Sequence, residues 1–176
     1  MSTSRTTSCR SSMNPYHLAR VHQYSKSHTK TWSEKIASLD AYIFVTPEYN
    51  HATSAALKNA IDFLFHEWNN KAAGFVGYGG AGGVPVENLR LVMGEIKIAD
   101  VKAQVALSIF TDFENFTTFK PHEHHDNSVH LMADEVIAWG GALKALRRTT
   151  GKKYPHRPRA FTHKIVHQVY RICSAF

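Results

Sequence analysis

The fold is decided by residues 41–65, AYIFVTPEYNHATSAALKNAIDFLF, where an apolar run meets an amphipathic pattern. The run AYIFV is unbroken and stops at Pro47, which is typical of a parallel strand covered on both faces. A helix is predicted over 53–68, with Thr53 or Ser54 as its N-cap. Its apolar positions recur at helical spacing, at Ala56, Leu57, Ala60, Ile61, Leu64 and Phe65.

The same alternation of strands and helices extends outward from this stretch. The expected elements are a short helix at 29–38, a strand at 72–78, a helix at 86–96, a strand at 101–107 and a long helix at 128–147. The apolar residues of the long helix are Leu131, Val136, Ile137, Trp139, Leu143 and Leu146. Alternation of this kind predicts an α/β fold, with a parallel sheet and crossover helices on both faces.

Length and composition predict one main domain with flanking segments. The chain has 176 residues, of which 43% are hydrophobic, enough to bury a core. We expect an irregular N-terminal segment at 1–27, a domain at 28–147 and a basic tail at 148–176. Residues 32–143 hold 14 acids and seven bases, whereas the stretch from Lys144 onward has nine bases and no acid. A binding protein acting through basic ends is therefore one alternative, although no nucleic-acid motif is present and nucleic-acid binding is not expected.

Membrane insertion and secretion find no support in the sequence. No apolar run approaches the ~20 residues that a spanning helix needs. The Ser-, Thr- and Arg-rich start lacks the apolar core of a secretory signal, which leaves an irregular start or a weak likeness to an organelle transit peptide. Cys9 and Cys173 show no metal-binding spacing, so free thiols in a reducing compartment, the cytoplasm, are expected.

Two loops follow predicted strands and precede predicted helices, at the sheet edge where ligands of such folds bind. The first, TPEYNH (46–51), carries an aromatic ring, an amide and a carboxylate, which together suit a flat polar heterocycle. The second, YGGAGG (78–83), has four glycines in six residues and lets a ligand approach the backbone closely. It is neither a GxGxxG fingerprint nor a P-loop. Composition alone leaves plain turns open at both places.

Taken in order, the two motifs carry a family resemblance. VTPEYNHATSAALKNAIDFL (45–64) and KAAGFVGYGGAGGVPVENLRLVM (71–93) resemble the NADPH-dependent FMN reductases, a flavodoxin-like group with an α/β/α fold that includes quinone and azo-dye reductases. The resemblance covers about 32–147. It implies that the flavin ring contacts Pro47, Glu48, Tyr49 and Asn50 in the first loop, and Tyr78, Gly79, Gly80, Ala81 and Gly82 in the second.

The activity that the resemblance implies is hydride transfer from NADPH or NADH through bound FMN. The final acceptor would be a small molecule, namely a flavin, a quinone or a similar compound, and the protein would be a homodimer. The flavin performs this chemistry, so no side chain is named as a general acid or base and no metal is required.

The N-terminus departs from the family pattern. Members begin with a strand, a loop that holds the FMN phosphate, a helix and a second strand, and residues 1–31 are too short for these. The first strand is central in the 2-1-3-4-5 order, so the predicted sheet is N-terminally incomplete and has an open edge. The alternative is therefore an inactive remnant, or a subunit completed by a partner, without the phosphate loop.

Two further clusters have alternative interpretations. His122, His124 and His125, with Glu123 and Asp126, are either metal ligands or part of a solvated loop. The aromatic stretch DFENFTTF (112–119) either packs internally or, in a dimer, covers the flavin or a nicotinamide. The three tryptophans, Trp32, Trp68 and Trp139, are expected to pack in the core.

Overall fold

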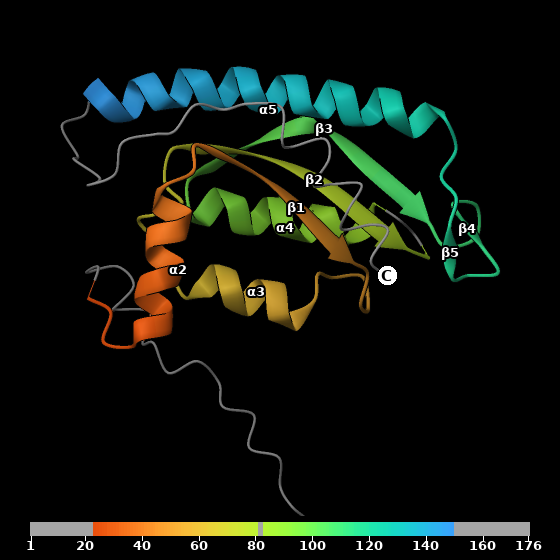
Figure 1. Cartoon of the computed structure of the whole chain (residues 1–176), viewed down its shortest axis with the longest axis horizontal. Helices are drawn as coiled ribbons and strands as arrows, with labels where there is room; N and C mark the ends of the chain where they lie inside the picture. Colours follow the sequence, from red (N-terminus) through yellow and green to blue (C-terminus); the bar gives the residue numbers. More distant parts are fainter. Residues whose placement is uncertain (1–22, 81–82, 150–176) are drawn as a thin grey trace, which may run out of the picture.

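The computed structural model describes residues 23–80 and 83–149 of the chain. Its elements are α2 (Ser27–Ala37), β1 (Ala41–Pro47), α3 (Ala55–Asp62), β2 (Lys71–Gly79), α4 (Val84–Glu95), β3 (Ile98–Ser108), β4 (Phe113–Glu114), β5 (Thr118–Phe119) and α5 (His124–Thr149). The sheet lies between two helical layers, with α5 on one face and α2, α3 and α4 on the other (Figure 1). The predicted α/β class with a parallel sheet is confirmed.

The three long strands are parallel and lie in the order β1-β2-β3. Their register places Pro47 beside Tyr78, and Gly79 beside Ser108. The three strands therefore end together at one edge of the sheet, where the following loops meet. Within the described residues β1 pairs with β2 alone, so its second edge carries no strand in this part of the chain.

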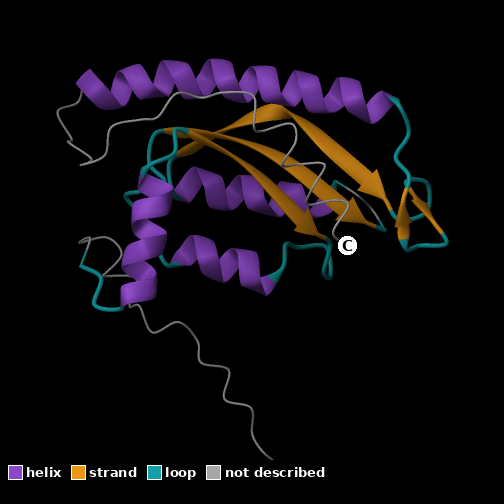
Figure 2. Cartoon of the chain, viewed as in Figure 1, coloured by secondary structure: helices purple, strands orange, loops and turns teal. Residues whose placement is uncertain are grey.

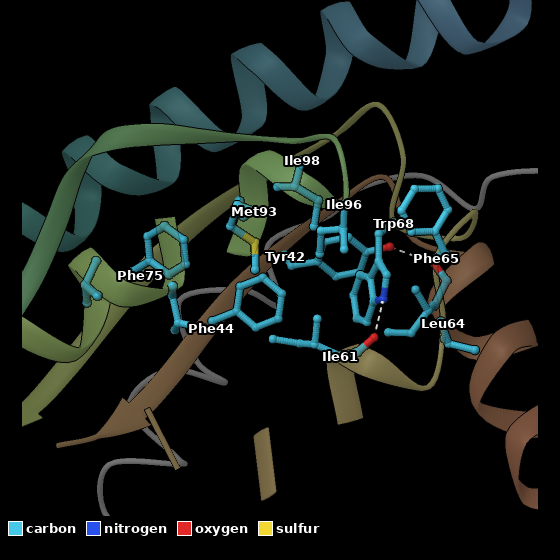
Figure 3. Close-up of a cluster of buried hydrophobic side chains, with 14 residues drawn as sticks. Tyr42, Phe44, Ile61, Leu64, Phe65, Trp68, Phe75, Met93, Ile96 and Ile98 are labelled. Carbon is cyan, nitrogen blue, oxygen red and sulfur yellow. Dashed lines mark hydrogen bonds between the residues drawn. The ribbon is translucent and has the colours of Figure 1, made fainter. Parts of the chain in front are cut away.

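An aromatic core fills the space between the sheet and helices α2, α3 and α4 (Figure 3). The ring of Trp68 packs edge-on against Tyr42, with 5.0 Å between centroids, and Phe44 stacks on Phe75 at 6.0 Å. Burial of such rings is a major favourable term in folding, because each removes a large apolar area from water. A second, aliphatic cluster joins the opposite face of the sheet to Val129, Met132 and Val136 of α5.

Helix α3 is shorter than the apolar spacing predicts. It begins after Ser54, whose side chain accepts a hydrogen bond from the Leu57 amide, as expected for an N-cap. It ends at Asp62, because the indole Nε1 of Trp68 donates to the Ile61 carbonyl at 3.1 Å and folds the chain back (Figure 3). The predicted continuation to Trp68 is therefore wrong, although Trp68 itself is buried in the core.

Helix α5 differs from the prediction in its start and in its buried face. It begins at His124 rather than at Ser128. Its buried residues include Val129, Met132 and Val136, whereas four of the apolar residues expected in the stripe are exposed: Leu131, Ile137, Trp139 and Leu146. Core packing for Trp139 is therefore wrong. No helix in the described ranges is both long and apolar enough to cross a membrane.

Candidate functional site

The first loop forms a tight turn at the end of β1. Tyr49 and Ala52 exchange two backbone hydrogen bonds, at 2.9 and 3.0 Å. Asn50 and His51 between them have φ values of 51° and 61°, as a type I′ turn requires. Asn tolerates this left-handed conformation better than most residues. The turn holds the Tyr49 ring outward, with 62% of the residue exposed.

Polar contacts fix this turn to the helices around it. Thr46 is fully buried, and its hydroxyl lies 2.6 Å from that of Thr53 across the base of the loop. At the tip of the loop, the side-chain amide of Asn88 in α4 donates to the His51 carbonyl. The Nδ1 atom of His51 also lies 3.4 Å from Oε1 of Glu48, whose side chain is largely buried. The loop is thus anchored at its base and at its tip.

The first and second loops are joined directly. The amide of Glu48 donates to the carbonyl of Tyr78 at 2.8 Å. Next to this bond, a Cβ placed on Gly79 would lie 2.5 Å from Cβ of Glu48, so only glycine fits there without movement. The structure therefore brings together Pro47, Glu48, Tyr78 and Gly79, four of the residues singled out from the sequence. Of the others, Ala81 and Gly82 lie outside the described residues.

The second loop leads into the N-terminus of α4. Gly83 is the N-cap residue and supplies no side-chain hydrogen bond to the helix. The first amides of a helix carry partial positive charge, which favours a negative or electron-rich group next to them. A Cβ on Gly83 would lie 3.0 Å from the side-chain nitrogen Nε2 of Gln104, so this turn is also closely packed against β3.

Asp112 organises a third loop, at the end of β3. Its carboxylate accepts hydrogen bonds from the Ser108 amide at 2.8 Å and the His122 amide at 3.3 Å. Nε2 of His125 lies 2.8 Å from the same carboxylate. Burial opposes the charge on Asp112, but the two amides and His125 outweigh it and lower the pKa of the carboxyl. No motif in the sequence marks Asp112 as a site residue; the signal for it is an aspartate four residues past the end of β3, ahead of a histidine cluster.

The aromatic stretch 112–119 holds three phenylalanines, which differ in their packing. Phe113 and Phe119 face each other across the β4–β5 hairpin, with 5.3 Å between ring centroids, and Phe119 packs on the aliphatic core. Phe116 is 66% exposed, as is Phe110, which precedes the stretch. Internal packing is therefore correct for Phe113 and Phe119 and wrong for Phe116. Figure 2 shows the hairpin beyond the carboxyl end of β3, beside the start of α5.

The histidine cluster does not assemble a metal site in the described part of the chain, where no three His, Cys, Asp or Glu side chains could share an ion. His125 is buried against Asp112, and the rings of His122 and His124 stack at 5.9 Å. The expected solvated loop is wrong for His125, which lies in the first turn of α5.

The three loops suit the ring of a flavin better than its phosphate. They offer an exposed tyrosine, closely approachable glycine backbone and a helix N-terminus, which match a flat heterocycle with polar edges. In their described residues the only lysine or arginine is Lys120, at the far side of the hairpin. The described residues of the loops therefore fit the isoalloxazine ring of FMN, and apart from Lys120 they contain no cationic Lys or Arg side chain to pair with its phosphate.

Comparison with known proteins identifies the family. The sequence profile described as NADPH-dependent FMN reductase matches residues 8–112. The chain belongs to this family. The FMN reductase profile thus begins before Trp32, the first residue of the motif-based resemblance. It includes the first two loops and the strands that precede them.

Individual members of the family are similar over shorter stretches. An NAD(P)H-dependent FMN reductase of Schizosaccharomyces pombe is 44% identical over 90 residues, which is 51% of this chain and 45% of the relative. LOT6 of Saccharomyces cerevisiae, with the same description, is 51% identical over 69 residues, or 39% of this chain and 36% of LOT6. An NAD(P)H:quinone oxidoreductase of Solanum tuberosum is 39% identical over 57 residues, 31% of this chain and 29% of the relative. The chain spans less than half the length of each of these three relatives.

Among solved structures, the apo form of an NADH:FMN oxidoreductase aligns with a TM-score of 0.48 at 16% identity. The alignment covers 88% of this chain and 76% of that one.

Proposed function

We propose that the chain binds the isoalloxazine ring of FMN between its first two loops and catalyses electron transfer from NADPH or NADH to a small acceptor. The acceptor is a free flavin, a quinone or a compound of similar chemistry. Membership of the FMN reductase family supports this, and so do relatives described as FMN reductases and quinone oxidoreductases. The observation that carries the proposal is the bond between Glu48 and Tyr78, which joins the two loops into one surface.

Each loop has a distinct role in this proposal. The amides of Glu48 and Tyr49 are committed to Tyr78 and Ala52, so in the first loop the ring contacts fall to Pro47, the Tyr49 side chain and the turn at Asn50. In the second loop the ring edge is assigned to Tyr78, Gly79 and Gly80, while Ala81 and Gly82, which the resemblance also implies, lie outside the described residues. The chemistry that FMN would supply there is the relay of a hydride, two electrons with one proton, from the nicotinamide to the acceptor, and a quinone acceptor would take its second proton from solvent.

The test is a flavin titration of the purified chain, followed by flavin fluorescence, with NADPH oxidation measured at saturation. Saturable quenching and turnover with a quinone support the proposal; no saturable quenching contradicts it. Riboflavin serves as the matched control, because it keeps the ring and lacks the phosphate. Equal affinity for FMN and riboflavin would locate binding in the described loops. A preference for FMN of 100-fold or more, about 2.7 kcal/mol, would place a phosphate site elsewhere in the chain.

The second candidate function is a flavodoxin-like subunit that has no activity until a partner completes its sheet. The specific observation in its favour is β1, a buried strand that pairs on one side alone in the described residues. A chain that binds no flavin by itself, but gains flavin binding when a second polypeptide is co-expressed, would establish this function in place of the first.

Three further properties are proposed with the activity. A homodimer agrees with the exposed large apolar side chains of α5, which are Leu131, Ile137, Trp139 and Leu146. Sedimentation velocity on the wild type and on Trp139→Ser tests it, and a monomeric wild type would refute it. A cytoplasmic location and a domain at 28–147 also remain proposals.

A further inference from the structure

Two phenylalanine rings face solvent at the edge of the proposed flavin surface. Phe110 and Phe116 are each 66% exposed, and their rings meet edge to face, with 5.9 Å between centroids and 89° between planes. The neighbouring pair, Phe113 and Phe119, shows that the same short hairpin can turn its rings inward. The outward pair therefore forms a small apolar surface of its own, on which a flat ring could stack.

The backbone holds this pair in place at an energetic cost. Asn115 and Phe116 have φ values of 52° and 60°, in the left-handed region. Asparagine adopts this region readily, but a bulky aromatic residue does so rarely and under strain. These two residues are the central pair of the turn that joins β4 to β5, in which the Thr117 amide donates to the Glu114 carbonyl at 3.2 Å, and a turn of this kind requires the left-handed conformation at both. Further contacts come from Asp112, whose carboxylate and carbonyl hold both ends of the loop, at Ser108 and Lys120.

The pair adjoins the glycine-rich loop directly. The amide of Ile109 donates to the carbonyl of Gly79 at 3.1 Å. One residue further along each loop, a Cβ placed on Gly80 would lie 3.9 Å from Cε2 of Phe110. The Phe110 ring therefore borders the loop that lines the flavin edge, so a molecule resting on the ring would lie next to the flavin.

Charge decides which kind of molecule suits this surface. Glu114 and Glu123 lie exposed in the same segment as the two rings, and the lysine there, Lys120, lies 4.0 Å from Glu114. Acidic surroundings disfavour the phosphates of a dinucleotide and favour an uncharged ring. We propose that Phe110 and Phe116 form the docking surface for the flat ring of an uncharged electron acceptor, a quinone, beside the glycine-rich loop. This inference rests on the proposed flavin-dependent activity.

The test compares Phe110→Leu/Phe116→Leu with the wild type in full-length, FMN-loaded protein. Menadione is the flat acceptor, and ferricyanide is the acceptor without a stackable ring. Loss of two ring contacts is expected to raise the KM for menadione about tenfold, about 1.4 kcal/mol. The KM for ferricyanide, the Kd for FMN and the rate of flavin reduction by NADPH stay unchanged. Phe110→Tyr/Phe116→Tyr restores the menadione KM, and Leu91→Ala, on the exposed side of α4, is the matched control.

Each other result has a defined meaning. An unchanged menadione KM in the leucine variant, with normal flavin reduction, overturns the acceptor surface and leaves the proposed function intact. A raised KM for NADPH alone assigns the rings to the nicotinamide and also overturns it. A change from dimer to monomer in sedimentation assigns them to a subunit contact. A wild type that binds no FMN and oxidises no NADPH removes the proposed function, and the acceptor surface with it.

Discussion

Glu48 and Gly79 lie so close together that the second loop has no space for a side chain: a Cβ on Gly79 would be 2.5 Å from Cβ of Glu48. Gly79→Ala must therefore separate the two loops. We expect a loss of about 1–3 kcal/mol in the free energy of unfolding, as for other overpacked sites, and a Kd for FMN raised about tenfold. Urea unfolding and flavin fluorescence measure the two effects. Gly94→Ala, where a Cβ meets nothing within 4 Å, is the control; equal behaviour of both variants would contradict the prediction.

Replacement of two adjacent glycines of α5 by alanine should change the free energy of unfolding by different amounts. A Cβ on Gly141 meets nothing within 4 Å, whereas one on Gly140 lies 3.2 Å from Cβ of Ala41 in β1. Gly141→Ala should stabilise the protein by about 0.5–1 kcal/mol, because alanine is the better helix former. Gly140→Ala should gain less or destabilise, because α5 must then move away from the sheet. Thermal unfolding of the two variants checks this, and equal gains would show that α5 packs more loosely on β1.

The buried amine of Lys71 should make the free energy of unfolding depend on pH. Its Nζ atom is buried and donates to the Ile36 carbonyl at 2.7 Å and the Tyr42 hydroxyl at 2.9 Å. Burial, followed by repulsion from Arg147, lowers the pKa of Lys71 from 10.5 to about 7, against the attraction of Asp40 and Glu67. The fold thus favours the neutral amine, while the unfolded chain keeps its proton up to the ordinary pKa.

The sign of the effect follows from this difference. Between pH 7 and 10.5 the unfolded state binds more protons, so the free energy of unfolding rises with pH, by at most about 1.4 kcal/mol per pH unit from this group. Below pH 7 Lys71 contributes no slope. Lys71→Met should flatten the rise, as measured by denaturant unfolding at a series of pH values. Lys58→Met, which removes an exposed lysine paired with Asp62, should leave the slope unchanged. A rise that persists in Lys71→Met would contradict the assignment.

Asp112→Asn should loosen the third loop. One carboxylate oxygen becomes an NH2 group facing a donor, so we expect a loss of about 1–3 kcal/mol in the free energy of unfolding. The pKa of Asp112 is lowered from 3.8, so its contribution is complete above that pH and is lost as the pH falls through the lower, folded value. The difference in the free energy of unfolding between wild type and Asp112→Asn should therefore narrow only at acid pH. Asp62→Asn, at an exposed pair, should change stability by about 0.5 kcal/mol or less.

The fold could be predicted wherever apolar periodicity is local. The strands at 41–47 and 71–79 contain the apolar runs 41–45 and 72–78, and a strand of this kind can be predicted without knowledge of its partners. The boundaries that failed depend on distant or specific contacts. Helix α3 stops because the Trp68 indole binds the Ile61 carbonyl, and α5 starts early where His125 binds Asp112. Apolar spacing alone could not show either bond.

The positions of the two flavin loops were predictable, but the contacts that shape them were not. Motifs at strand ends indicated Glu48 and Gly79, whereas nothing in the sequence showed that the two would touch. Buried charges were also missed, because their partners are far along the chain. Lys71 binds the Ile36 carbonyl 35 residues away, and Glu67 accepts from the Ser33 hydroxyl 34 residues away. Burial of charged groups follows from tertiary contacts, which a hydropathy pattern does not contain.

The order of the strands has a consequence for how the protein is made. β1 pairs with β2 and β2 with β3, so each strand finds its partner in the next one to leave the ribosome. Each pairing is parallel and must close a crossover that contains a helix, so it is slower than the closing of a hairpin but needs no strand from later in the chain. The sheet can therefore grow outward from β1 during synthesis, before α5 exists to cover its upper face. Within the described residues the second edge of β1 has no partner strand, and an unpaired strand edge of this kind invites pairing with another chain until it is covered.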